Sequence, residues 1–277
     1  MTRINEFFSD ESPEGRMAGS VSAADTLAQI NRIAEARTVE MAWRIGIEAL
    51  GAFGFERVNY GYTRYRVGVG IGDPADAFFL STHALEAIKH YHTSGLYLRS
   101  ADFRWVRENV GACSWGWVRE ERRAGRLSAD ECAVMDQLGS GRQRAGYTVS
   151  FPVNTPRSKG AMALAARVGV RQQEVDAHWL AHEDGLMALT HVLHLKLSQM
   201  PLPVDRARLT ARQSEILGWI ADGKAMADVC ILTGLSRSAV EKHLRAARDR
   251  LNVETTAHAV AKVSFLNQLF VQHETGA

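Results

Sequence analysis

The spacing of apolar residues predicts a chain that mixes helices and strands in its first part and is purely helical at its end. Apolar positions three and four apart predict a helix over residues 23–50, capped by Ser22, and a long helix over residues 172–200. Alternating apolar and polar residues predict a strand over residues 57–67. Further elements are expected over residues 82–94 (helix), 128–138 (helix, opened by a Ser128 capping box), 147–153 (strand) and 161–168 (strand). Because tight turns join some of these strands, we expect an α+β fold, an α/β/α sandwich with an antiparallel sheet.

The last part of the chain has the pattern of a four-helix all-α domain. Thr210 and Gln213 have the spacing of a capping box, which predicts a helix start there. Gly223 is placed to end that helix, and Gly234 to end a short helix over residues 225–233. Ser236 then caps a longer helix, whose inward stripe is expected to be Val240, Leu244, Ala247 and Leu251. A short helix, a glycine turn and an amphipathic helix form the layout of a helix-turn-helix.

Two prolines mark the boundary between these two patterns. Pro201 and Pro203 cannot continue the preceding helix, so residues 201–208 are expected to be a linker. The linker separates a first domain over residues 21–200 from a second domain over residues 209–277. Residues 1–20 are polar and show no periodicity, so we expect them to form a mobile tail.

Positive charge is concentrated on the second helix of the predicted helix-turn-helix. The whole chain has a formal net charge of only +2, whereas basic residues outnumber acidic ones on this helix. A solvated surface helix can carry the same charge, but the complete layout favours DNA in the major groove. Arginine can pair with guanine, and Lys242, Arg245 and Arg248 suit phosphates. The side chains expected to contact DNA are Thr210, Lys224, Arg237, Ser238, Glu241, Lys242, Arg245 and Arg248.

Composition excludes several other classes of protein. The three cysteines contain no CxxC pair, and no apolar run is long enough to span a membrane, so we expect a cytoplasmic protein. His178 and His182 are one helical turn apart, but no further ligands accompany them, so no metal and no cofactor is expected. The sequence has no GxSxG, HExxH or P-loop motif, which argues against an enzyme.

Residues 209–260 resemble the DNA-binding domain of LuxR-type regulators. The matching positions are Leu209, Thr210, Arg212, Glu215, Leu217, Trp219, Gly223, Lys224, Val229, Leu235, Ser236, Val240, His243, Leu251, Val253, Ala259 and Val260. The resemblance implies that the helix from Ser236 to Leu251 recognises DNA and that the last helix pairs two copies. The residues implied in that pairing are Ala257, Val260, Ala261 and Phe265. Ala225, Met226 and Ala239 depart from the family pattern, which weakens a helix cap and removes one phosphate contact.

The first domain resembles the autoinducer-binding domain of quorum-sensing regulators, which bind N-acyl-homoserine lactones. The most similar stretches are residues 127–131 and 144–152. The resemblance implies that Asp102 binds the ligand amide, and that Thr148, Tyr91 and one of Trp115 and Trp117 line the site. The full expected ligand set is Tyr60, Tyr62, His83, Tyr91, Asp102, Trp115, Trp117 and Thr148. Ala87 stands where the family has a tryptophan that donates to the lactone, so an unusual acyl or aryl lactone, or a related small molecule, is also compatible.

The preferred hypothesis is a homodimeric, ligand-responsive transcriptional regulator that binds double-stranded DNA. A ligand-independent regulator of the same type is the alternative, and a thermal shift with a small molecule would separate the two. A phosphorylation-switched response regulator is disfavoured, because the first predicted strand is not followed by an acidic pair. An enzyme that uses the sensor domain is disfavoured by the lack of a catalytic set.

Overall fold

The computed structural model describes residues 17, 21–64, 66, 70, 77–83, 94–139, 145–153, 155–201 and 209–269. Its contacts divide the chain into two compact units, one that ends at Ser198 and one that begins at Gln199. The predicted helix over residues 82–94 and the predicted tail over residues 1–20 lie almost entirely outside the described residues.

The first unit is built on an antiparallel sheet. Its strands are β1 (Phe55–Thr63), β2 (Phe78–Ser81), β3 (Gly111–Ser114), β4 (Gly146–Ser150) and β5 (Lys159–Ala166). Their order across the sheet is β2-β1-β5-β4-β3, and every described neighbouring pair is antiparallel. The strands predicted over residues 57–67, 147–153 and 161–168 therefore exist, each shifted by a few residues at its ends.

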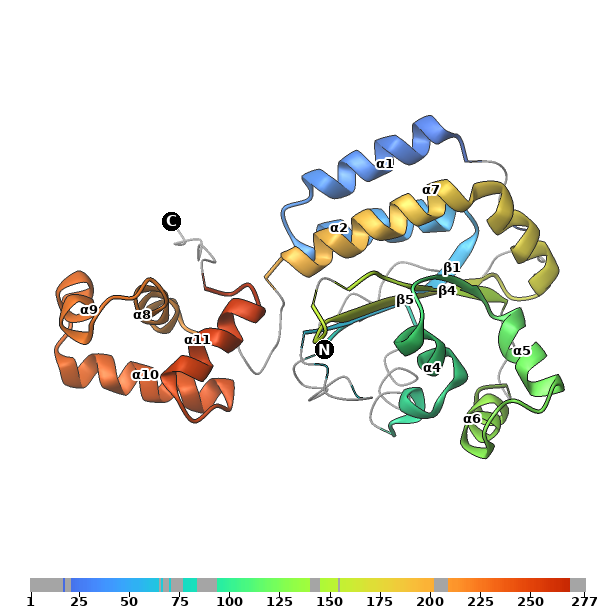
Figure 1. Ribbon diagram of the computed structural model, residues 1–277. Coiled ribbons are helices and arrows are strands. Elements are labelled where there is room, and N and C mark those ends of the chain that lie inside the picture. The colour runs from blue at the N-terminus through green and yellow to red at the C-terminus, as the bar shows by residue number, and fades with distance from the viewer. Residues whose placement is uncertain are drawn as a thin grey trace. The chain divides into compact units, whose positions relative to one another are not determined.

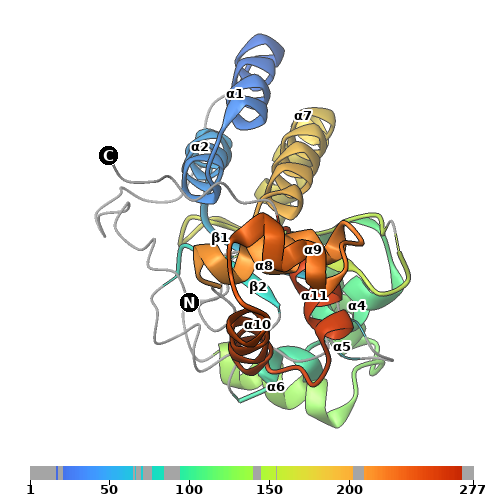
Figure 2. The same ribbon diagram turned by 90° about the vertical axis from the view of Figure 1, so that its left-hand side faces the viewer.

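Helices cover both faces of this sheet, as the two views agree (Figure 1, Figure 2). One layer consists of α1 (Ala23–Glu35), α2 (Val39–Ala52) and α7 (Gln172–Gln199). The other layer consists of α4 (Ala101–Glu108), α5 (Gly116–Arg123) and α6 (Ala129–Gly139), with the short 3-10 helix η2 (Leu96–Arg99) before α4. The predicted α/β/α sandwich with an antiparallel sheet is confirmed.

The single helix predicted over residues 23–50 is wrong, because the chain forms α1 and α2 instead. Ala36 leaves the helical conformation with ψ 136°, and the Thr38 hydroxyl accepts a hydrogen bond from the Met41 amide at the start of α2. Apolar spacing continues through the break, since Ile33, Ala36 and Val39 are all buried. Periodicity therefore could not reveal the break, whereas the Thr38 cap creates it.

The second unit contains α8 (Ala211–Ala221), α9 (Met226–Thr233), α10 (Arg237–Leu251) and α11 (Thr256–Phe265). Thr210 and Gln213 form the predicted capping box at the start of α8. Gly234 ends α9 with φ 67°, a left-handed conformation that favours glycine. The predicted inward stripe of α10 is confirmed, because Val240, Leu244, Ala247 and Leu251 are all buried.

The start of α9 is capped from one side only. Ala225 has no side chain that could accept a hydrogen bond, and Asp228 alone accepts one, from the Ala225 amide at 3.2 Å. The weaker cap expected from Ala225 is therefore present.

Candidate functional site

The two faces of the sheet carry different side chains, because successive residues of a strand point to opposite sides. The α7 face carries large, fully buried side chains: Val58, Tyr60, Val149, Met162 and Leu164. The opposite face, called the α4 face from here on, carries small or polar residues that are only partly buried on the inner strands: Asn59, Gly61, Ala161 and Ala163. Hydrogen bonds identify the faces, since Tyr60 Oη lies 2.9 Å from His194 Nδ1 on α7 and Ser150 Oγ donates to the Val106 carbonyl of α4 at 3.1 Å. The α4 face is therefore the more open side of the sheet.

Trp115 and Thr148 meet on the α4 face. The Trp115 indole N–H donates to Thr148 Oγ1 at 2.8 Å, and Thr148 lies opposite Cys113 on the neighbouring strand. Gly146 makes this arrangement possible, because a Cβ there would lie 2.8 Å from the Trp115 ring. The Thr148 hydroxyl accepts from Trp115 and therefore keeps its own proton available as a donor.

Asp102 lies in the first turn of α4, which begins at the Ser100 cap. Burial raises the pKa of the Asp102 carboxyl to about 6. Within the part of the chain that the structure describes, no donor forms a hydrogen bond to this carboxylate. Burial, and to a smaller extent the charge of Asp102, raises the pKa of the Cys113 thiol to about 12, so Asp102 lies near the Thr148–Cys113 pair. A partly buried carboxylate without a protein partner is suited to accept a hydrogen bond from a ligand.

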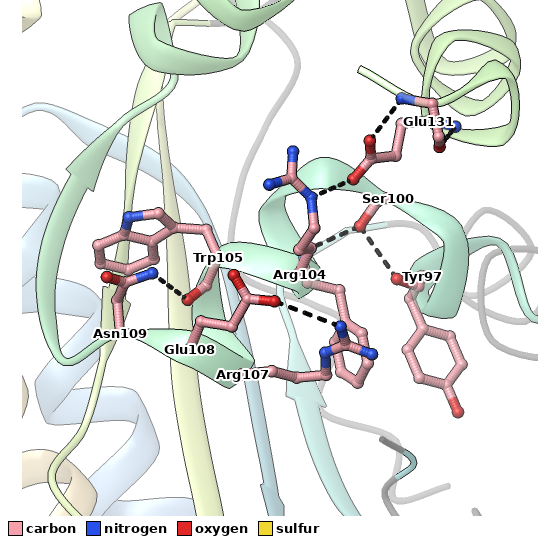
Figure 3. Close-up of polar contacts among 10 residues, drawn as sticks. Tyr97, Ser100, Arg104, Trp105, Arg107, Glu108, Asn109 and Glu131 are labelled. Atoms are coloured by element: carbon pink, nitrogen blue, oxygen red, sulfur yellow. Dashed lines mark hydrogen bonds and ion pairs between the residues drawn. The ribbon is translucent and has the colours of Figure 1, made fainter. Parts of the chain in front are cut away.

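Contacts on either side hold α4, and with it Asp102, in place, and Figure 3 shows the contact with Glu131 of α6. Arg104 forms an ion pair with Glu131 at 2.6 Å, and Glu131 also accepts from the Ser128 amide in the capping box of α6. Ser150 Oγ also lies 2.6 Å from the Asn109 carbonyl at the end of α4. The helix is therefore fastened to α6 and to β4.

The two candidate tryptophans have different positions. Trp117 lies beneath the Arg104 guanidinium, 5.5 Å from its carbon to the ring centroid, whereas Trp115 bonds to Thr148. The structure thus brings Trp115 and Thr148 together, places Asp102 near Cys113 on the strand beside Thr148, and places Trp117 in the contact between α4 and α5.

Tyr60 and Tyr62 require a correction. Both point to the α7 face, where Tyr62 packs edge-on against His194 with ring centroids 5.5 Å apart. They belong to the core, because their even-numbered positions on β1 face away from Thr148. His83 follows β2 and donates its backbone N–H to Ser81 Oγ at 3.0 Å. Tyr91 and Ala87 lie outside the described residues.

The exposed side of α10 carries the side chains expected to contact DNA. Arg237, Ser238, Glu241, Lys242 and Arg245 are all exposed. Arg237 Nε donates to Glu241 at 3.0 Å, which aligns the two side chains one helical turn apart.

The other three side chains expected to contact DNA differ in their exposure and in their partners. Arg248 is half-buried and donates to Thr256 of α11 at 3.0 Å, so it joins two helices. Thr210 is exposed, with its hydroxyl accepting from the Gln213 amide, and Lys224 is exposed after Gly223. Lys242 and Arg245 have no hydrogen bond or ion pair to any described residue, which leaves their charges available for phosphates.

A strip of α11 faces away from the core of the second unit. Ala257, Ala261 and Phe265 are exposed, Val260 is half-buried, and the opposite side of the helix is buried through Ala259 and Val263. This strip contains all four residues expected to pair two copies.

The small residues of the α4 face were not among the residues predicted from the sequence to form the site. The signal was present in β5, where Ala161, Ala163 and Ala165 alternate with Met162 and Leu164. Alternation of small and large residues marks one open and one filled face, but Asn59 and Cys113 could be assigned to the open face only through the strand register.

The geometry defines a class of protein, a two-domain DNA-binding regulator with a ligand-binding α/β/α domain before a helix-turn-helix. A family model described as autoinducer binding domain matches residues 38–197, and one described as bacterial regulatory proteins, luxR family, matches residues 207–263. The chain belongs to the LuxR family of bacterial regulators and carries an autoinducer-binding domain. It is therefore a ligand-responsive, DNA-binding transcriptional regulator of the quorum-sensing type.

Several characterised proteins are similar to this chain over most of its length. The transcriptional activator protein TraR of Rhizobium radiobacter is 28% identical over 209 residues, which cover 69% of this chain and 87% of TraR. The transcriptional activator protein BjaR1 of Bradyrhizobium diazoefficiens is 24% identical over 218 residues, which cover 77% of this chain and 83% of BjaR1. Among solved structures, CepR2 of Burkholderia cenocepacia is 16% identical with a TM-score of 0.48, covering 63% of this chain and 96% of that one. Among the described residues, no helix is both long enough and apolar enough to span a membrane.

Proposed function

We propose that the autoinducer of this regulator is a homoserine lactone whose amide lies on the α4 face, between Asp102 and Thr148. The observation that carries the proposal is the Asp102 carboxylate, which is partly buried, forms no hydrogen bond to any described residue, and lies near the Thr148–Cys113 pair. A polar group in this state favours a ligand that supplies the missing donor.

The two side chains match the two halves of an amide. With a pKa of about 6, the Asp102 carboxyl is mostly ionised at neutral pH and accepts the amide N–H in a charge-assisted hydrogen bond. Thr148 Oγ1 already accepts from Trp115, so its hydroxyl proton is directed to a carbonyl oxygen. The raised pKa of Cys113 keeps that residue a neutral thiol, which suits a site for reversible binding.

Ligand binding is coupled to DNA binding through a homodimer in this proposal. The exposed strip of α11, with Ala257 and Ala261 at its centre, allows two helices to approach closely around a two-fold axis. Two copies of α10 then enter successive major grooves of cytoplasmic DNA, with Arg237 and Glu241 at base edges and Lys242 and Arg245 at phosphates.

The test is calorimetric titration of the full chain with N-octanoyl-homoserine lactone. Asp102→Asn should weaken binding by roughly tenfold to a hundredfold, because the charged acceptor is lost. The matched control is Asp130→Asn, which changes an exposed aspartate in the first turn of α6 and should leave the affinity unchanged. Equal affinity of the wild type and Asp102→Asn would contradict the placement of the amide. Absence of binding to any lactone, with specific DNA binding intact, would instead favour a ligand-independent regulator.

A further inference from the structure

A single cross-strand row on the α4 face connects the proposed amide site to a second polar group. The register pairs Ser81 with Asn59, Asn59 with Ala163, Ala163 with Thr148, and Thr148 with Cys113. The row therefore has polar side chains at both ends and a small apolar residue between them. Neighbouring strands are about 4.8 Å apart, so Asn59 and Thr148, two strands apart, are separated by about 10 Å.

The Asn59 carboxamide has hydrogen-bonding capacity that the protein does not use. Ser81 Oγ accepts the His83 backbone N–H and donates its own proton to Asn59 Oδ1. This chain of bonds assigns the oxygen of the carboxamide to Ser81 and leaves its NH₂ group as a donor pair. No described residue accepts from that NH₂ group. Asn59 and Ser81 are both only partly buried, although Asn59 lies on an inner strand.

The residues between the two polar ends leave room for a ligand. Gly61, Ala161 and Ala163 carry at most a methyl group and are partly exposed on the inner strands. The Phe79 ring packs beside Gly61, where an added Cβ would lie 3.2 Å from its nearest carbon. A slender apolar chain that crosses Ala163 would thus run over a smooth surface with an aromatic ring at its far side.

We propose that Asn59, held by Ser81, is a specificity-determining residue that binds an oxygen at the far end of the ligand's acyl group. This inference rests on the proposed function, because it takes the amide end to lie at Asp102 and Thr148. An extended chain covers about 1.2 Å per bond, so an acyl chain of about eight carbons with a terminal oxygen spans about 10 Å. The ligand class is therefore a homoserine lactone with an oxygen acceptor at the end of a medium-length acyl group.

The test compares two ligands that differ by one hydroxyl, N-octanoyl-homoserine lactone and its ω-hydroxy derivative. An unpartnered hydroxyl moved from water onto an apolar surface weakens binding roughly tenfold or more. The wild type should nevertheless bind the ω-hydroxy ligand at least as tightly as the octanoyl ligand. Asn59→Leu should weaken the ω-hydroxy ligand about tenfold and leave the octanoyl ligand unchanged or tighter. Asn31→Leu, an exposed asparagine on α1, is the matched control and should change neither affinity.

The outcomes separate this inference from the function on which it rests. A wild type that prefers the octanoyl ligand by tenfold, or an Asn59→Leu variant that weakens both ligands equally, would overturn the specificity role and leave the lactone proposal standing. Binding of neither ligand to the wild type would overturn both. If Asn59→Leu does not fold, Ser81→Ala, which removes the support of the carboxamide, should weaken only the ω-hydroxy ligand.

Discussion

At the scale of single residues, Asp102 links stability to pH. Its pKa rises from 3.8 to about 6 on folding, so between these values the folded state holds a proton that the unfolded state has lost. The free energy of unfolding therefore falls as pH rises through this window, by about 3 kcal/mol in total. Asp102→Asn should raise the free energy of unfolding of the ligand-free protein at about pH 7.5 by about 1–3 kcal/mol, measured by urea denaturation. A variant less stable than the wild type at this pH would contradict the prediction.

The control for that measurement is the dependence of the free energy of unfolding on pH. His194 acts in the same window with the opposite sign, because burial lowers its pKa to about 4 and protonation disfavours the folded state as pH falls. The two effects partly offset one another in the wild type. The increase in the free energy of unfolding caused by Asp102→Asn should therefore disappear as pH falls towards about 4. Because only the His194 effect remains in the variant, its free energy of unfolding should fall more steeply with falling pH than that of the wild type.

At the scale of elements, the contact of α2 with α7 depends on one glycine. A Cβ on Gly46 would lie 2.4 Å from Leu193 Cδ2, and Leu193 is fully buried, so its side chain would have to shift within a packed core. Gly46→Ala should lower the free energy of unfolding by about 1–3 kcal/mol in a denaturation experiment. Gly51→Ala in the same helix is the matched control, because nothing lies within 4 Å of its Cβ position and alanine favours helix. It should be neutral or stabilise by about 0.5–1 kcal/mol, and equal losses for both variants would refute the packing argument.

At the scale of the whole molecule, α10 should determine how DNA affinity responds to salt. Lys242→Ala removes one phosphate contact, so it should weaken binding to all DNA sequences and reduce the slope of log affinity against log salt by about 1. Arg237→Ala should instead cost about 1–3 kcal/mol on the preferred operator alone, and relax its sequence preference. Fluorescence anisotropy at several salt concentrations measures both effects. Arg123→Ala, an exposed arginine on α5, is the control, and a slope unchanged by Lys242→Ala would remove Lys242 from the interface.

A homodimer also predicts the form of the operator. Two copies of α10 related by a two-fold axis require inverted half-sites whose centres are about 10 base pairs, or a multiple of that, apart. Insertion of about five base pairs between the half-sites places the second on the opposite face of the DNA and should abolish tight binding in a gel-shift assay. Undiminished affinity for such an operator would contradict the proposed pairing of two copies.

Interactions within one helix or turn could be predicted from the sequence alone. The Thr210–Gln213 capping box, the left-handed Gly234 and the inward stripe of α10 each depend on residues a few positions apart. Such short spacings fix which groups meet, whatever the rest of the chain does. The helix-turn-helix and its exposed basic face followed from these local patterns.

Only the tertiary structure decided the ligand-binding face. Alternation along β1 separates Tyr60 and Tyr62 from Asn59 and Gly61, but it does not say which set lies under α7. That choice depends on pairing with β5, a hundred residues further along, and on which helices cover each face. The same holds for Trp115 and Trp117, which are only two residues apart in the sequence. Their different roles become clear only from their partners on distant elements, Thr148 for Trp115 and Arg104 for Trp117. Contacts between distant segments arise from packing of the whole core, which no local spacing encodes.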